Sequence, residues 1–137
     1  VKEKTKENPV FYVQYAYARI NSIMRTLNLN FDLKIELNEN NFKLFKIEER
    51  IIRKVFEWPK IIESSTKKFD LHKIPFYLYE LSTLFHAYWS KGNEDKKYKF
   101  IENERSKRPE ILVIINLVAL VIQNGMKILG VSLPNKM

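Results

Sequence analysis

The feature that most constrains this sequence is a nearly uninterrupted apolar run from Ile111 to Ile122, in which Asn116 is the one polar residue. Pro109 and Glu110 precede the run, as is typical of the first turn of a helix, and Gly130 is suited to cap its end. The run is shorter than the roughly twenty residues that a membrane-spanning helix needs, and polar residues follow at once. A helix that is apolar all round has to be surrounded by other elements. The sequence therefore predicts a buried central helix in a bundle and no membrane partner.

Several other segments have the spacing of helices that bury one face. Asn8 is a plausible N-cap for the first of them, with Pro9 at its first helical position. The predicted helices run from Pro9 to about Thr26 or Leu27, from Phe42 to Trp58 with Pro59 as a stop, from Lys60 to Phe69, and onward from Pro75. Together with the apolar run they predict an all-α helical bundle of roughly five to seven helices.

The chain is expected to form a single domain over residues 1–137, because 16.4 kDa is enough for one core and leaves no room for a second. Val1 to Glu7 reads as an exposed linker that begins without an initiator methionine or a signal-peptide pattern, so we expect a piece of a longer protein. Gly92 to Arg108 is rich in charge and poor in apolar residues, which predicts a charged surface connection.

Composition narrows the classes of function. Lys and Arg number 24 against 16 Asp and Glu, so the net charge is +8, which favours a polyanionic partner such as nucleic acid or an anionic membrane surface. The absence of cysteine excludes disulfides and thiolate metal sites and suits a reducing cytosol. No phosphate-binding loop, zinc motif or nucleophile motif is present, and His72 and His86 lack ligating neighbours at suitable spacing, so both are expected to be capping or boundary residues. We expect no catalytic residue, no metal and no cofactor in this chain.

The helix predicted from Pro9 carries two different faces. Tyr12, Tyr15 and Arg19 fall, together with Thr26, within about a sixth of the helical wheel. A separate apolar stripe beside them consists of Val13, Tyr17, Ile20, Met24 and Leu27. Spacing alone favours a core or boundary role for the tyrosines. Aromatic rings also stack on nucleic-acid bases, however, and a guanidinium pairs with base edges or phosphates, so this face is a candidate RNA-binding surface.

Three strings, NPVFYVQYAYAR, DLHKIPFYLYELSTLFHAYW and QNGMKILGVSLPNKM, resemble the C-terminal DALR anticodon-binding domain of arginyl-tRNA synthetases, which are class I enzymes. Their order and spacing match over nearly the whole chain. The letters that name the domain are replaced here by Asp70, Leu71, His72 and Lys73, and the central helix carries less charge than is usual in that family. The resemblance implies an all-helical domain. It also implies five tRNA anticodon-binding residues, which are Tyr12, Tyr15, Arg19, Tyr88 and Met137.

The resemblance implies that the parent protein is an arginine-tRNA ligase in the cytoplasm, and a monomer, that uses ATP and magnesium in a catalytic domain absent from this chain. The fragment itself would be catalytically inert. It would recognise the anticodon loop of arginine tRNA, with the middle anticodon cytosine as the principal base read and the third position also sensed. The alternative is a basic helical module that docks on another protein or on an anionic surface without regard to base sequence.

Overall fold

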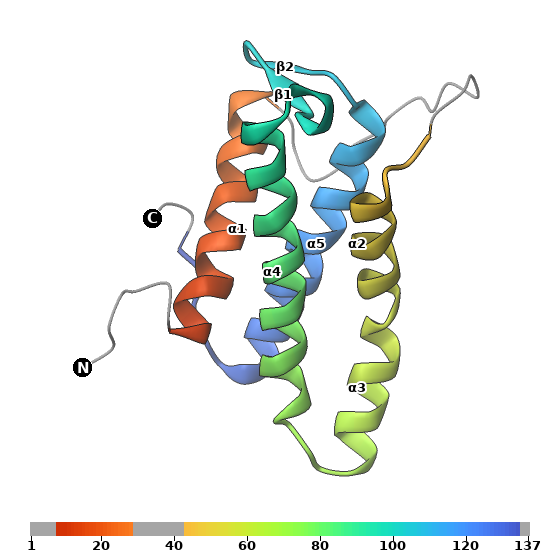
Figure 1. Cartoon of the computed structure of the whole chain (residues 1–137). Coiled ribbons are helices and arrows are strands. Elements are labelled where there is room, and N and C mark those ends of the chain that lie inside the picture. The colour runs from red at the N-terminus through yellow and green to blue at the C-terminus, as the bar shows by residue number, and fades with distance from the viewer. Residues whose placement is uncertain (1–7, 29–42, 135–137) are drawn as a thin grey trace.

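The computed structural model describes residues 8–28 and 43–134, and these residues form an all-α bundle (Figure 1). The α-helices are α1 (Pro9–Thr26), α2 (Lys46–Phe56), α3 (Trp58–Lys67), α4 (Lys73–Glu94) and α5 (Pro109–Leu129). The connection between α4 and α5 holds a 3-10 turn, η1 (Lys96–Tyr98), and two antiparallel strands, β1 (Ile101–Glu102) and β2 (Arg105–Ser106). The predicted fold class is confirmed, with a number of helices at the lower end of the expected range. The predicted linker at Val1 to Glu7 lies outside the described residues.

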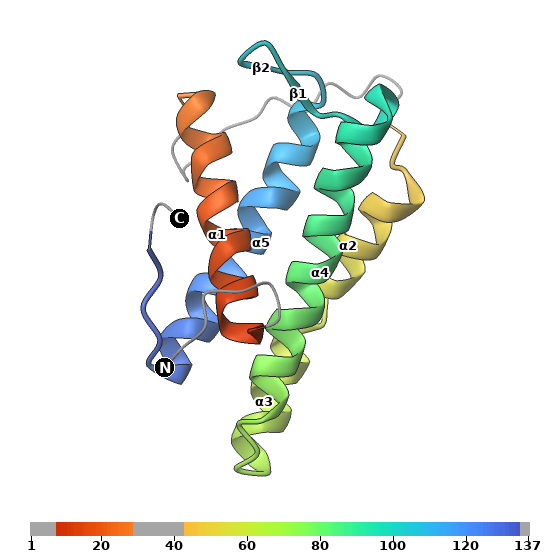
Figure 2. The same cartoon turned by 60° about the vertical axis from the view of Figure 1, so that its left-hand side comes forward.

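The helix α4 lies at the centre of the bundle and packs against each of the other four helices. In Figure 1, α1 flanks α4 on one side, and α2 and α3 lie on the other. The view turned by 60° in Figure 2 shows α5 running between α1 and α4. Apolar side chains at helical spacing along α4 are buried, including Leu78, Leu81 and Phe85. The core therefore forms where α1, α4 and α5 meet, with α2 and α3 closing its far side.

The ends of α1 and α5 follow their sequence signals. Asn8 caps α1, because its side-chain oxygen accepts a hydrogen bond from the backbone N–H of Val10 at 3.1 Å. Gly130 ends α5 in the left-handed conformation, with φ at 70°. Gly125 lets α5 approach α4 closely, because a Cβ atom there would lie 2.8 Å from a methyl carbon of Leu78.

The helix that contains the apolar run is longer than the run itself, so its length does not exclude a membrane span, contrary to the expectation from the sequence. The helix α5 has 21 residues, and it is the one described helix long and apolar enough to cross a membrane by length and composition alone. Of its most apolar window, 56% is buried inside the bundle. The reading of α5 as a core helix therefore rests on this burial, which includes Ile111, Ile115 and Ile122 at no more than 1% exposure.

The boundary between α2 and α3 also differs from the expectation. The helix α2 ends at Phe56, and α3 begins only two residues later, so that Pro59 lies in the first turn of α3. Proline is tolerated in a first turn because the backbone N–H that it lacks would have no partner within the helix. Phe56, the last residue of α2, is 70% exposed.

The connection from Gly92 to Arg108 is anchored more firmly than its composition predicts. The helix α4 continues into it as far as Glu94, and the hairpin turns at Asn103 and Glu104, which both have positive φ. Phe100 is only 2% exposed, and its ring lies 5.4 Å from that of Tyr88. One buried ring thus holds a charged hairpin against the end of α4 that lies beside the end of α1 (Figure 1).

Candidate nucleic-acid interface

The face of α1 that carries Tyr12, Tyr15 and Arg19 lies against α4 at the edge of the bundle. Each of these three side chains is half-buried, whereas the neighbouring stripe with Val13 and Ile20 is fully buried. The two faces predicted for this helix are therefore present. A half-buried aromatic or guanidinium group is fixed in position by its inner edge while its outer edge stays open to a ligand.

Tyr12 forms an aromatic cluster with two side chains of α4. Its ring centroid lies 5.3 Å from that of Tyr79 and 4.4 Å from that of His86. Burial raises the pKa of the Tyr12 hydroxyl, an effect that a hydrogen bond with Thr83 partly opposes. Tyr12 is therefore a neutral phenol at physiological pH. His86 also contacts Tyr15, at 5.7 Å between ring centroids, and so joins the two tyrosines. It is buried, at 8% exposure, whereas a capping or boundary position was expected.

Arg19 is held by aromatic side chains on two sides. Its Nη2 donates a hydrogen bond to the Tyr15 hydroxyl oxygen at 3.2 Å, and its Cζ lies 4.9 Å from the centroid of the Tyr15 ring. The same carbon lies 5.4 Å from the Trp89 ring. Within residues 8–28 and 43–134, no carboxylate forms an ion pair with this guanidinium. The charge of Arg19 therefore remains available to an acceptor-rich ligand.

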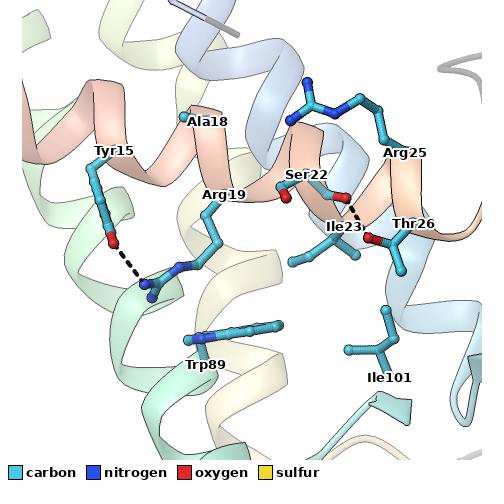
Figure 3. A pocket seen from close by; sticks show the side chains of 9 residues that line it. All are labelled: Tyr15, Ala18, Arg19, Ser22, Ile23, Arg25, Thr26, Trp89 and Ile101. Carbon is cyan, nitrogen blue, oxygen red and sulfur yellow. Dashed lines mark hydrogen bonds between the residues drawn. The ribbon is translucent and has the colours of Figure 1, made fainter. Parts of the chain in front are cut away.

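Beside Arg19 the surface is hollowed by a half-open pocket of about 570 Å³. The residues that line the pocket are Tyr15, Ala18, Arg19, Ser22, Ile23, Arg25, Thr26, Trp89 and Ile101 (Figure 3). This volume is in the range of sites for small organic ligands. The pocket has the rings of Tyr15 and Trp89 in its lining, and Figure 3 shows the Arg19 side chain extending between them. The other polar groups of the lining, two hydroxyls and a second guanidinium, come from α1. Such a hollow offers flat apolar contact together with donors for a base edge.

Tyr88, which the resemblance placed with these residues, does not belong to this surface. It is 1% exposed, and its hydroxyl donates a hydrogen bond to Glu48 Oε2 at 2.5 Å. Burial, together with this bond, raises the pKa of the Tyr88 hydroxyl. The next residue, Trp89, is the one that faces the hollow. Met137, the fifth residue of the expected set, lies outside the described residues.

Glu48 is a buried residue, although it lies in a helix rich in charged residues, where a carboxylate is normally solvated. It is 1% exposed and receives hydrogen bonds from three groups besides Tyr88. Arg108 donates to it through Nη2 at 2.6 Å and Nε at 3.1 Å, and the backbone N–H of Phe45 donates at 2.8 Å. Because Arg108 directly precedes α5, this carboxylate links α2, α4 and the start of α5. We call Glu48, Tyr88 and Arg108 the buried clamp.

The C-terminal segment returns to α1 after α5. The side-chain amide of Gln14 donates a hydrogen bond through Nε2 to the backbone oxygen of Ser132 at 2.8 Å, across a separation of 118 residues. Val131 and Leu133 pack against the core from the same segment. The last described residues of the chain are thus fixed beside the helix that carries the candidate surface.

The chain is similar in sequence and in structure to proteins of one family. A sequence model of the family described as the DALR anticodon binding domain matches residues 13–137. The chain is 44% identical over its whole length to the arginine–tRNA ligase of Pelagibacter ubique and 38% identical to that of Allorhizobium ampelinum. A crystal structure assigned to an arginyl-tRNA synthetase of Campylobacter jejuni covers 98% of this chain, with a TM-score of 0.79 and 26% identity. The chain spans 24% of the length of the first two relatives and 28% of that crystallised chain.

Proposed function

Because the chain belongs to the family of DALR anticodon binding domains, we propose that it binds the anticodon loop of arginine tRNA as one part of an arginine–tRNA ligase. The hollow between Tyr15, Arg19 and Trp89 carries this proposal. It combines ring faces with an arginine whose charge no described carboxylate neutralises. Those are the groups that bind an unstacked base, and a tRNA anticodon loop presents such bases.

The chemistry of the hollow suits the reading of one base. Stacking of a base on an aromatic ring contributes about 1–3 kcal/mol, and a bidentate contact from arginine to a base edge contributes a similar amount. Arg19 is held between two rings, which reduces the conformational freedom that it loses on binding. The helix α1 has no acidic residue, so nothing on it repels the phosphates of the loop. We propose that the middle anticodon cytosine is the base read here, with the third position sensed nearby.

The proposal divides the work between this domain and the rest of the parent protein. The domain holds the anticodon loop, and the catalytic domain, with ATP and magnesium, attaches arginine at the other end of the tRNA in a cytoplasmic monomer. Within the described part of the chain, no group of three or more His, Cys, Asp or Glu residues could hold a metal ion. The role that we propose for this domain is binding alone.

The proposal predicts a fluorescence change at Trp89 when RNA binds. Of the chain's two tryptophans, Trp58 is 8% exposed and stacks on Tyr77 among α2, α3 and α4, so Trp58→Phe leaves Trp89 as the single reporter. Addition of an arginine tRNA anticodon stem-loop should quench this emission, because a base stacked near the indole deactivates its excited state. The matched variant Trp89→Phe, which reports only from Trp58, should show no change. RNA binding detected by anisotropy without quenching in the Trp58→Phe chain would rule out the hollow as the base site.

A further inference from the structure

We propose that Tyr12 and Tyr79 form a second base-binding position, which stacks a neighbouring nucleotide of the same loop without reading its identity. This inference rests on the proposed function, since it adds a position to the same RNA interface. Tyr79 lies on α4, 38% exposed, outside the residues that line the hollow. Its ring centroid is 5.3 Å from that of Tyr12, with the ring planes inclined at 43°. We call this pair the tyrosine platform.

The platform is held rigidly enough to act as a stacking surface. Tyr12 is packed between Tyr79 and the buried His86, whose ring centroid lies 4.4 Å from that of Tyr12. The His86 Nε2 also lies 3.3 Å from the backbone oxygen of Tyr12, which fixes the imidazole against α1. Rings that are already ordered lose little conformational entropy when a base stacks on them.

The platform and the hollow lie on one continuous aromatic path. His86 contacts Tyr12 on one side and Tyr15 on the other, and Tyr15 contacts Arg19 of the hollow. Along α1, Tyr12 and Arg19 are separated by seven residues, or about 10 Å at 1.5 Å per residue. This short separation places both positions on the course of one single strand. Phe76, one turn before Tyr79 on α4 and 71% exposed, extends the apolar edge of the platform.

The chemical groups at the platform explain why it would not read sequence. The polar groups that the described residues place at the two rings are the hydroxyls of Tyr12, Tyr79 and Thr83, while the guanidinium of Arg19 influences Tyr12 by its charge and is held at the hollow by Tyr15 and Trp89. The acidic neighbour Glu80 is ion-paired with Lys54 of α2, so its charge is directed to the other side of α4. Every base has a face that can stack on such rings, whereas recognition of a base edge requires oriented donors and acceptors.

Tyr79→Ala tests the platform. We expect it to weaken binding of the anticodon stem-loop about five- to tenfold, by equal factors for the arginine sequence and for a copy altered at the middle anticodon base. Tyr79→Trp should retain the affinity, because it keeps a flat ring. The salt dependence should stay that of the unchanged chain, since no phosphate contact is removed. Phe56→Ala removes a more exposed ring, 70% against 38% for Tyr79, from the end of α2, a helix on the side of α4 away from α1 (Figure 1), and should have no effect.

The possible results separate this inference from the proposed function. Unchanged affinity in Tyr79→Ala would overturn the platform, and so would a loss confined to one of the two stem-loops. If the unchanged chain binds both stem-loops equally, the proposed reading of the anticodon fails, whereas an equal loss from Tyr79→Ala would still support the platform. If neither stem-loop binds, both proposals fail. Unfolding curves of each variant show whether any loss arises from the fold.

Discussion

Glu48→Ala is expected to lower the free energy of unfolding by about 3–5 kcal/mol, the range for removing one partner from a buried charge pair. The substitution leaves the buried hydroxyl of Tyr88 without its acceptor and takes from Arg108 both of its bonds to the carboxylate. It also removes the acceptor for the backbone N–H of Phe45 before α2. Urea denaturation followed by circular dichroism measures the change.

The next residue provides a matched control for this prediction. Glu49 is also in the first turn of α2 but is exposed, so Glu49→Ala should change the free energy of unfolding by about 0.5 kcal/mol or less. In a double-mutant cycle, Tyr88→Phe should cost much less in the Glu48→Ala background than in the unchanged chain, because the shared hydrogen bond is already lost. Equal losses for Glu48→Ala and Glu49→Ala would show that the buried clamp does not stabilise the bundle.

Arg19→Ala is expected to reduce the preference for the arginine anticodon over a copy altered at the middle base by about 1–3 kcal/mol. The guanidinium is the charged donor group held over the hollow by Tyr15 and Trp89, so its removal takes away edge recognition and leaves the ring surfaces. Titration of both stem-loops with the variant chain, at one fixed salt concentration, gives the difference in binding free energy.

Arg19→Lys separates charge from geometry in this prediction. Lysine keeps the positive charge but lacks the planar group that stacks on rings and pairs in a bidentate manner. We therefore expect Arg19→Lys to retain part of the total affinity while losing most of the base preference. If Arg19→Ala weakened the two stem-loops equally, Arg19 would be a phosphate contact and the base would be read by other residues.

The sequence predicted well those features that depend on local signals. The start of α1 at Pro9 and the end of α5 at Gly130 follow from caps whose partners lie within a few residues. The two faces of α1 follow from helical periodicity, which fixes the angular positions of Tyr12, Tyr15 and Arg19 independently of the rest of the fold. That these three residues share a half-buried face of α1 is confirmed, while their role in binding RNA stays a prediction.

Features that depend on long-range partners were missed. Tyr88 and Trp89 are adjacent on α4, and the pattern allowed either to face the core. Tyr88 is the one that is buried, because its hydroxyl bonds to Glu48. Glu48 is 40 residues from Tyr88 and 60 from Arg108 in the sequence. A carboxylate in a charged helix has the local pattern of a solvated residue, so neither its burial nor the position of Trp89 could be read from the neighbouring residues.

The most direct test of anticodon recognition is fluorescence anisotropy of this chain with an arginine tRNA anticodon stem-loop and with a copy altered only at the middle anticodon base. The titrations are made at two salt concentrations, because phosphate contacts weaken with salt whereas base contacts depend on it much less. Our account predicts tighter binding of the arginine sequence and a ratio of affinities that persists at the higher salt. Equal affinities that both collapse at the higher salt would contradict it and would indicate a basic helical bundle that binds polyanions without reading the anticodon.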